Sequence, residues 1–162
     1  MNEENKAVEP ASVDELVKVT GQLRILHTDE HGNVKEDRTV KNLVVTTGKT
    51  HIASRLAGTS SGVMSHMEVG TSSQAAVVGD TTLVAAVAGS RTALGSITAG
   101  VPTANAVRHI CTFGAGVGTG ALTEAGLFNA SSAGSMLART LFSVINKSAG
   151  DSIVISWDLT IS

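Results

Sequence analysis

The sequence predicts a mainly β protein: a β-sandwich or barrel-like domain with one or two short helices. Short apolar alternations recur at intervals of about 8–12 residues, and turn-forming residues separate them. Apolar residues make up 42% of the chain and charged residues 16%, whereas a soluble domain is usually about a quarter charged. This balance favours a packed core over disorder. The length of 162 residues favours one domain with a short appendage.

The first elements are a predicted hairpin. Residues 17–26 alternate between apolar and polar side chains, which indicates a half-buried strand. Residues 29–33 read Asp-Glu-His-Gly-Asn and form a turn. Residues 34–45 return as a second strand, and the charges in its middle are typical of a sheet edge.

A short helix and a series of strands follow the hairpin. Residues 47–57 read as the helix, with Thr47 as a possible N-cap and Gly58 placed for the C-terminal left-handed turn. Asp80 is a possible cap for a second helix of one or two turns through Val84. The remaining strands are expected at residues 64–69, 91–98, 105–113, 121–128, 136–145 and 153–161.

Charge is unevenly distributed and divides the chain. Residues 1–16 carry one base and five acids, and we expect them to form an acidic N-terminal arm. Residues 17–162 are expected to form a single β-rich domain, with residues 17–45 as its leading hairpin and residues 46–162 as a low-charge core module. The module has six bases and five acids in 117 residues. Because a free monomer usually carries more surface charge, we predict that much of this module faces other protein copies. A Ser- and Thr-rich surface that is soluble without charge is the alternative.

Composition argues against several protein classes. No window of about 18 apolar residues could form a membrane-spanning helix, and the polar, acidic start lacks the apolar segment of a signal peptide. Cys111 is the only cysteine, which excludes an internal disulfide framework and a cysteine-based zinc site. The net charge of −2 and the few aromatic residues predict no direct binding of nucleic acid. We expect no membrane partner, and synthesis inside the cell.

Two glycine-containing motifs resemble nucleotide-binding sequences but lack essential parts. Residues 46–50 read Thr-Thr-Gly-Lys-Thr, the end of a phosphate-binding loop, but Leu43 stands where the first glycine is required. Residues 114–121 match a permissive dinucleotide fingerprint, yet a strand follows where a helix is needed. We interpret the first as a strand-to-helix turn and the second as a flexible loop or contact surface. No cofactor is expected.

The titratable residues show no catalytic pattern. His27 and His31 flank a turn and could bind a metal with Asp29, although solvated turn residues are the simpler interpretation. We therefore assign no metal site, while a histidine cluster on an oligomer axis stays open. Glu124 lies among small and apolar neighbours, where Glu is rarely buried unless it is paired. We predict a structural pair with Arg139 on the next strand; a catalytic carboxylate and simple exposure are the alternatives. No catalytic residue is assigned, and the protein is expected not to be an enzyme.

Six short motifs lie in order along roughly residues 40–162. They are residues 42–49 (NLVVTTGK), 67–71 (MEVGT), 79–81 (GDT), 122–129 (LTEAGLFN), 136–140 (MLART) and 153–161 (IVISWDLTI). As a set, they resemble the virion structural proteins of tailed bacteriophages. Similar modules occur in capsid-associated proteins and in tail, baseplate or fibre proteins. The family brings no catalytic residues with it.

The resemblance implies a β-sandwich that assembles as a symmetric homo-oligomer, with a trimer favoured. The expected location is the virion, after synthesis in the bacterial host cytoplasm. The expected function is that of a capsid decoration, or cement, protein that stabilises the head through contacts with the major capsid protein. The alternative is a tail, baseplate or fibre component that contacts tail proteins or takes part in host attachment. Residues 1–16 would then be the attachment arm.

Overall fold

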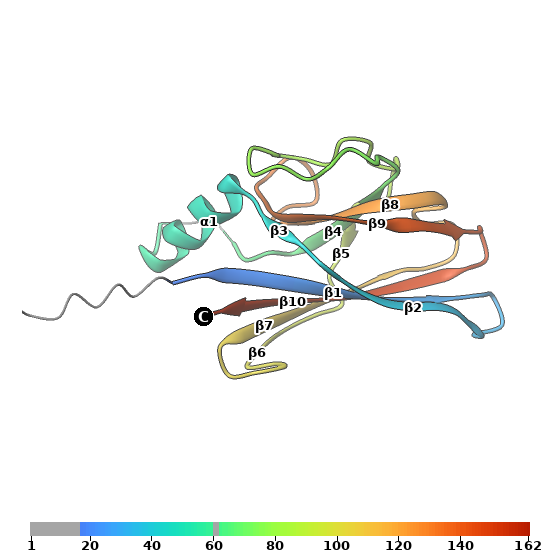
Figure 1. The fold of residues 1–162 in the computed structure, drawn as a ribbon, viewed down its shortest axis with the longest axis horizontal. Coiled ribbons are helices and arrows are strands. Elements are labelled where there is room, and N and C mark those ends of the chain that lie inside the picture. Colours follow the sequence, from blue (N-terminus) through green and yellow to red (C-terminus); the bar gives the residue numbers. More distant parts are fainter. Residues whose placement is uncertain (1–16, 60–61) are drawn as a thin grey trace, which may run out of the picture.

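The computed structural model describes residues 17–59 and 62–162, in which two five-stranded antiparallel sheets pack face to face (Figure 1). The prediction of a mainly β fold is confirmed, and the two sheets form a sandwich and not a closed barrel. The predicted N-terminal arm, residues 1–16, lies outside the described residues. The leading hairpin is part of the sandwich, because its first strand pairs with the last strand of the domain.

The first sheet has the first and last strands near its centre. Its order is β2 (Val34–Lys41), β1 (Val19–Thr28), β10 (Ser152–Ile161), β7 (Ala106–Phe113) and β6 (Ser96–Ala99). β1 and β10 pair over their whole length, from Val19 opposite Ile161 to Thr28 opposite Ser152. β2 and β6 are the edges of this sheet, and all four residues of β6 are exposed.

The second sheet is built around the β8–β9 hairpin. Its order is β3 (Leu43–Val44), β9 (Met136–Lys147), β8 (Gly120–Phe128), β4 (His66–Gly70) and β5 (Thr92–Ala93). The register of β8 against β9 shifts between Leu122 and Glu124. Such a bulge re-aims the side chains that follow it. The edge strands β3 and β5 have only two residues each.

The core lies between the two sheets. Aliphatic side chains and Phe113 pack there around Trp157, and all of these residues are buried. The Trp157 indole Nε1–H donates to Asn42 Oδ1 at 3.0 Å. This bond gives the buried indole nitrogen the hydrogen-bond partner that a buried Trp usually has. The regular alternation of the last strand is thus explained: Ile153, Ile155 and Trp157 all face this core.

Two predicted strands are each divided between the sheets. The strand expected at residues 34–45 ends as β2 at Lys41 and resumes in the other sheet as β3. The strand expected at residues 91–98 is likewise split into β5 and β6. At the first crossing both β2 and β3 contribute side chains to the core, namely Val40 and Val44, whereas at the second only Leu94, between β5 and β6, packs against it. The prediction of single strands is therefore wrong at these two places.

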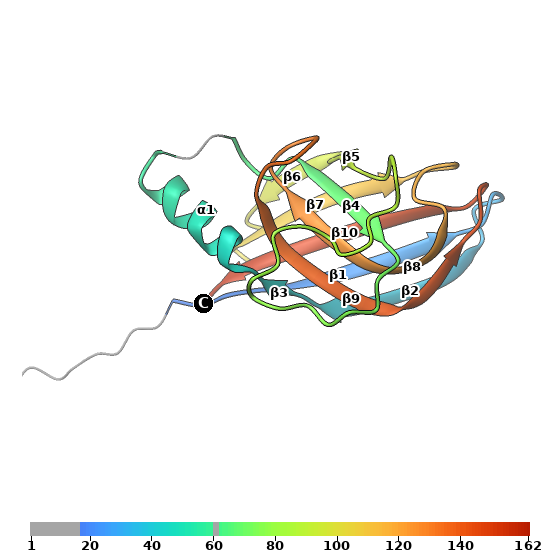
Figure 2. The same ribbon diagram turned by 90° about the horizontal axis from the view of Figure 1, so that it is seen from above.

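Helix α1 (Thr46–Leu56) lies at one end of the sandwich, beside β9 and the C-terminus (Figure 2). Gly58 has a φ of 69°, so the predicted left-handed turn after the helix is confirmed. The predicted N-cap is wrong: the helix begins directly after Val45 without a side-chain cap. The Thr47 hydroxyl instead donates to the Met136 carbonyl at 2.8 Å.

The second predicted helix does not form. Residues 71–90, which we call the strap, cross the outer face of the second sheet without regular structure (Figure 1). Asp80 does not cap a helix, because its carboxylate accepts the Val77 N–H at 2.9 Å and also binds a buried guanidinium. Leu83 of the strap is buried in a small apolar cluster with Phe128 and Met136. The strap therefore gives the second sheet a second buried face.

Candidate functional site

Glu124 and Arg139 form a fully buried ion pair beneath the strap. Arg139 Nη2 lies 2.8 Å from Glu124 Oε2, and Nε donates to the same oxygen at 2.9 Å. Both side chains have no exposed surface. The two predicted residues are thus in contact, on adjacent strands of the second sheet. The local sequence allows this because Gly70 of β4, the residue opposite Glu124, has no side chain, and a Cβ there would lie 2.5 Å from Glu124 Oε1.

The Glu124 carboxylate also accepts hydrogen bonds from the strap backbone. Oε1 accepts the N–H of Ala85 at 2.8 Å and of Ser72 at 3.4 Å, and Oε2 accepts the N–H of Val84 at 3.3 Å. An irregular segment laid over a sheet needs such partners for its backbone donors, since unpaired buried N–H groups are costly. A substrate has no access to this carboxylate in the arrangement described.

The Arg139 guanidinium binds the strap through its acceptors. Nη1 donates to Asp80 Oδ2 at 2.8 Å, and more weakly to the Ala75 carbonyl at 3.4 Å. Nη2 donates to the Gln74 carbonyl at 2.9 Å. The buried pair therefore binds backbone N–H groups of the strap through Glu124 and backbone carbonyls of the strap through Arg139. Its role in the structure is to hold the strap in place.

Charge is sparse in the stretch of chain that contains the strap and Glu124. The structure describes every residue from 69 to 138, and this stretch contains only four Asp, Glu, Lys or Arg side chains. On the strap, Val77, Val78 and Val84 are about half exposed. Each of the four charges lies in an ion pair: Asp80 and Glu124 with Arg139, Arg91 with Glu68, and Arg108 with Asp158. Half the domain thus presents uncharged, small side chains to its surroundings.

The three candidate metal ligands of the first hairpin are not brought together. Asp29 Oδ1 accepts the backbone N–H groups of His31 and Asn33 at 2.9 and 2.8 Å, which closes the turn. His27 is buried, and its Nε2 lies 2.8 Å from Asp151 Oδ2. Across residues 17–59 and 62–162, no three His, Cys, Asp or Glu side chains gather where they could hold a metal ion.

Asp151 is the centre of a second polar cluster, which sequence patterns did not indicate. Its Oδ2 accepts from Lys35 Nζ at 2.8 Å and from the Ser148 N–H at 2.9 Å, besides contacting His27. These partners, Lys35 foremost, hold the pKa of the Asp151 carboxyl well below its usual range. Lys147 Nζ donates to the carbonyls of Gly114 and Asp151. The cluster fixes the turn between β9 and β10.

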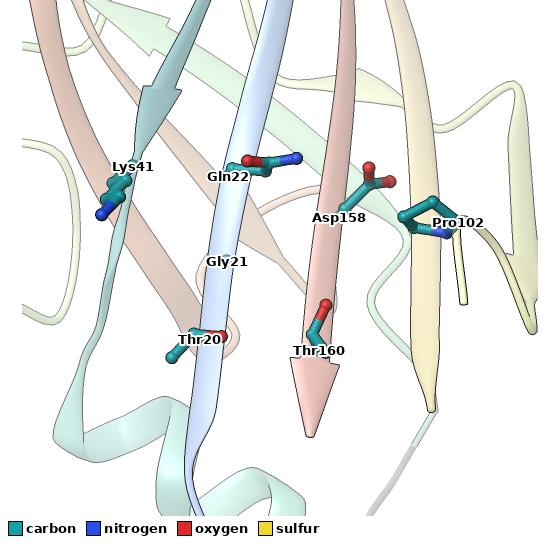
Figure 3. A pocket seen from close by; sticks show the side chains of 7 residues that line it. All are labelled: Thr20, Gly21, Gln22, Lys41, Pro102, Asp158 and Thr160. Atoms are coloured by element: carbon teal, nitrogen blue, oxygen red, sulfur yellow. The ribbon is translucent and has the colours of Figure 1, made fainter. Parts of the chain in front are cut away.

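A polar hollow of about 380 Å³ lies on the outer face of the first sheet. Figure 3 shows side chains from β1, β2 and β10 around it, together with Pro102 of the loop after β6. Asp158, the one acidic residue of its lining, is bound through both oxygens by Arg108 at 2.7 and 2.8 Å. The lining contains no aromatic side chain, although sugar-binding sites usually stack an aromatic ring on the ligand.

An apolar groove opens at the end of the sandwich, beside α1. We call it the end groove, and its two adjoining hollows measure about 210 and 340 Å³. Five exposed apolar side chains line it, which is half of the large exposed apolar residues of the described structure: Val17, Leu56, Val63, Ile97 and Ile161. Sequence patterns did not reveal this groove, because its lining residues come from seven separate segments.

The two nucleotide-like motifs occupy ordinary structural positions. Residues 46–50 begin α1 directly after β3, so no loop surrounds a phosphate there. Residues 114–119 connect β7 to β8 as an interstrand loop. Helix α1, at 11 residues, is too short to cross a membrane, and the described residues contain no longer apolar helix.

Comparison with known proteins finds no match to a family model, to a curated protein or to a solved structure.

Proposed function

We propose that this protein is a non-enzymatic structural component of a tailed-phage virion that decorates the head as a homo-oligomer. In this role it contacts the major capsid protein and stabilises the shell. The motif resemblance supplies the virion context. The structural observation that carries the proposal is the surface of residues 69–138, where every charged side chain is already paired within the same molecule.

Such a surface is suited to burial against other proteins. Burying an unpaired charge is expensive because the charge loses its hydration. Interface cores are accordingly depleted of charged residues. On this domain the four charges are already paired, so contact through residues 69–138 removes mainly small apolar and hydroxyl side chains from water.

The strap also gives this surface a fixed shape. Its backbone is held by the buried carboxylate of Glu124 and the guanidinium of Arg139. A surface that is already ordered loses less conformational entropy when it binds. In a capsid, many copies with weak individual contacts then reinforce one another, since linked sites gain from effective concentration.

Quantitative mass spectrometry of purified virions, scaled to the major capsid protein, tests the proposal. We expect hundreds of copies per particle. A few to some tens of copies would instead assign the protein to the neck, tail or fibres, and its absence from virions would overturn the proposal.

A pair of matched variants tests the role of the strap surface. Val78→Lys adds a charge to the exposed strap, whereas Val34→Lys adds the same charge at the start of β2, and the two valines are 52% and 62% exposed. We expect Val78→Lys to reduce incorporation into virions and Val34→Lys to leave it unchanged. Equal incorporation of both variants would show that the strap is not the contact surface.

A further inference from the structure

The end groove combines an apolar floor with a basic rim. Ile52, Met64 and Leu159 contribute to its lining, and the charged residues of the lining are Lys49 and Arg55. Both charged residues are exposed. Apolar hollows of this kind with exposed apolar borders commonly mark binding sites for a protein segment. The natural ligand would combine apolar side chains with negative charge.

One residue of the lining carries a buried polar atom without a partner. His109 lines the groove and is 5% exposed, and its Nδ1 has no hydrogen-bond partner among the described residues. Buried polar atoms without partners are rare in native proteins.

The sequence contains one segment with the required chemistry. Residues 1–16 carry five acids and one base, interspersed with Ala7, Val8, Val13 and Leu16. The two charged residues of the groove lining, Lys49 and Arg55, are both basic. The acidic N-terminal segment is therefore complementary in charge to the rim of the groove.

The segment joins the described structure at the end groove, since Val17 is one of the residues that line it. Lys18 N–H donates to the terminal Ser162 oxygen at 2.6 Å, and Ser162 N–H donates back to the Lys18 carbonyl at 2.9 Å. The β1–β10 ladder thus continues to Ser162, and the C-terminus lies at the end of the sandwich where α1 lies (Figure 2). Sixteen residues can extend over roughly 50 Å, which is ample to reach a neighbouring domain.

We propose that residues 1–16 of one copy bind in the end groove of a second copy. Acidic side chains of the segment contact Lys49 and Arg55, and its apolar side chains cover Leu56 and Ile161. Such an arm-to-groove contact is heterologous, so repeating it forms a ring where the rotation between copies closes and a filament where it does not. This inference deepens the proposed self-association and rests on it.

Analytical ultracentrifugation of the full-length protein tests the contact through matched charge reversals. Arg55→Glu reverses a groove charge, and Lys41→Glu makes the same change on the outer face of the first sheet, away from the groove lining. We expect Arg55→Glu to raise the dissociation constant for self-association about tenfold and Lys41→Glu to leave it within about twofold. Equal effects of the two variants would overturn the proposal.

A mixing experiment identifies which copy supplies the segment. Lys49→Glu with Arg55→Glu reverses the groove, and Glu4→Lys with Glu9→Lys reverses the arm. Each double variant should associate weakly alone, and an equimolar mixture should associate at least about tenfold more tightly because opposite charges meet again. A mixture no tighter than its components would refute docking between copies. Hundreds of copies per virion together with a mixture no tighter than its components would overturn the arm contact alone, so failure here is separable from failure of the proposed function.

Discussion

Replacing Glu124 with Gln should destabilise the fold more than its small change in shape suggests. Both carboxylate oxygens accept hydrogen bonds, from Arg139 and from the backbone N–H groups of Ser72, Val84 and Ala85. The Gln amide has one oxygen acceptor and one NH₂ donor. Its NH₂ group would therefore face donors in either orientation, and Arg139 would lose its fully buried counter-charge.

The expected loss follows from the partners that remain. Removing one member of a buried ion pair costs about 3–5 kcal/mol, because the other charge is left uncompensated. Asp80 still contacts Arg139 at 2.8 Å, so the lower end of this range, about 3 kcal/mol, applies. For a protein of this size the loss corresponds to a decrease in Tm of about 6–12 °C.

Equilibrium urea unfolding followed by circular dichroism, together with calorimetry, measures this loss. The control is Asp37→Asn, which removes the carboxylate of the exposed Arg24–Asp37 pair, where the two side chains are 57% and 41% exposed. The control should shift the urea midpoint little, since exposed pairs contribute little to stability. Equal midpoints for the two variants would refute the anchor role of Glu124. If Glu124→Gln does not fold, Asp80→Asn gives a milder test of the same cluster.

Three further predictions concern packing, reactivity and pH. Gly48→Ala should destabilise the protein by at least about 2 kcal/mol although Ala normally favours helices, because its Cβ would lie 2.7 Å from the Leu137 carbonyl carbon; Gly79→Ala, with open space around it, is the control in thermal unfolding. Burial raises the pKa of the Cys111 thiol to about 12, so a thiol reagent should modify it only after unfolding; rapid modification of the native protein would contradict this. Because the pKa of Asp151 is lowered in the folded state, its contribution to stability is complete above about pH 5 and is lost as the pH falls below about 4. The acid-induced decrease of the urea midpoint should be smaller in Asp151→Asn, and identical pH profiles would exclude this contribution.

The sequence predicted local strand structure better than the path between sheets. Alternating side chains identified β1, β7, β8, β9 and β10 within a few residues, because alternation reports which side faces the core. The same signal cannot show a crossing between sheets, which occurs at Asn42 and again after Ala93. The strap was misread because Asp80 resembles a helix cap until its partner Arg139, 59 residues away, is known.

The candidate sites also differ in whether the sequence indicated them. Glu124 was identifiable because a carboxylate inside an apolar strand needs a partner, and Arg139 lies at a compatible place on the next strand. No short stretch of the sequence indicates the Asp151 cluster or the end groove. Asp151 meets Lys35 across 116 residues, and the groove depends on how α1 packs beside residues from both ends of the domain.

The unequal edges of the first sheet determine where misassembly would start. β2 carries five charged residues among its eight, whereas β6, with the sequence Ser-Ile-Thr-Ala, has none and is exposed throughout. Charge on an edge strand repels an incoming strand, and an uncharged edge is a template for one. In the second sheet both edges are too short to guide a partner. Amyloid-like growth at high concentration would therefore begin at β6, and a lysine in place of Ile97 or Thr98 is the change that would suppress it.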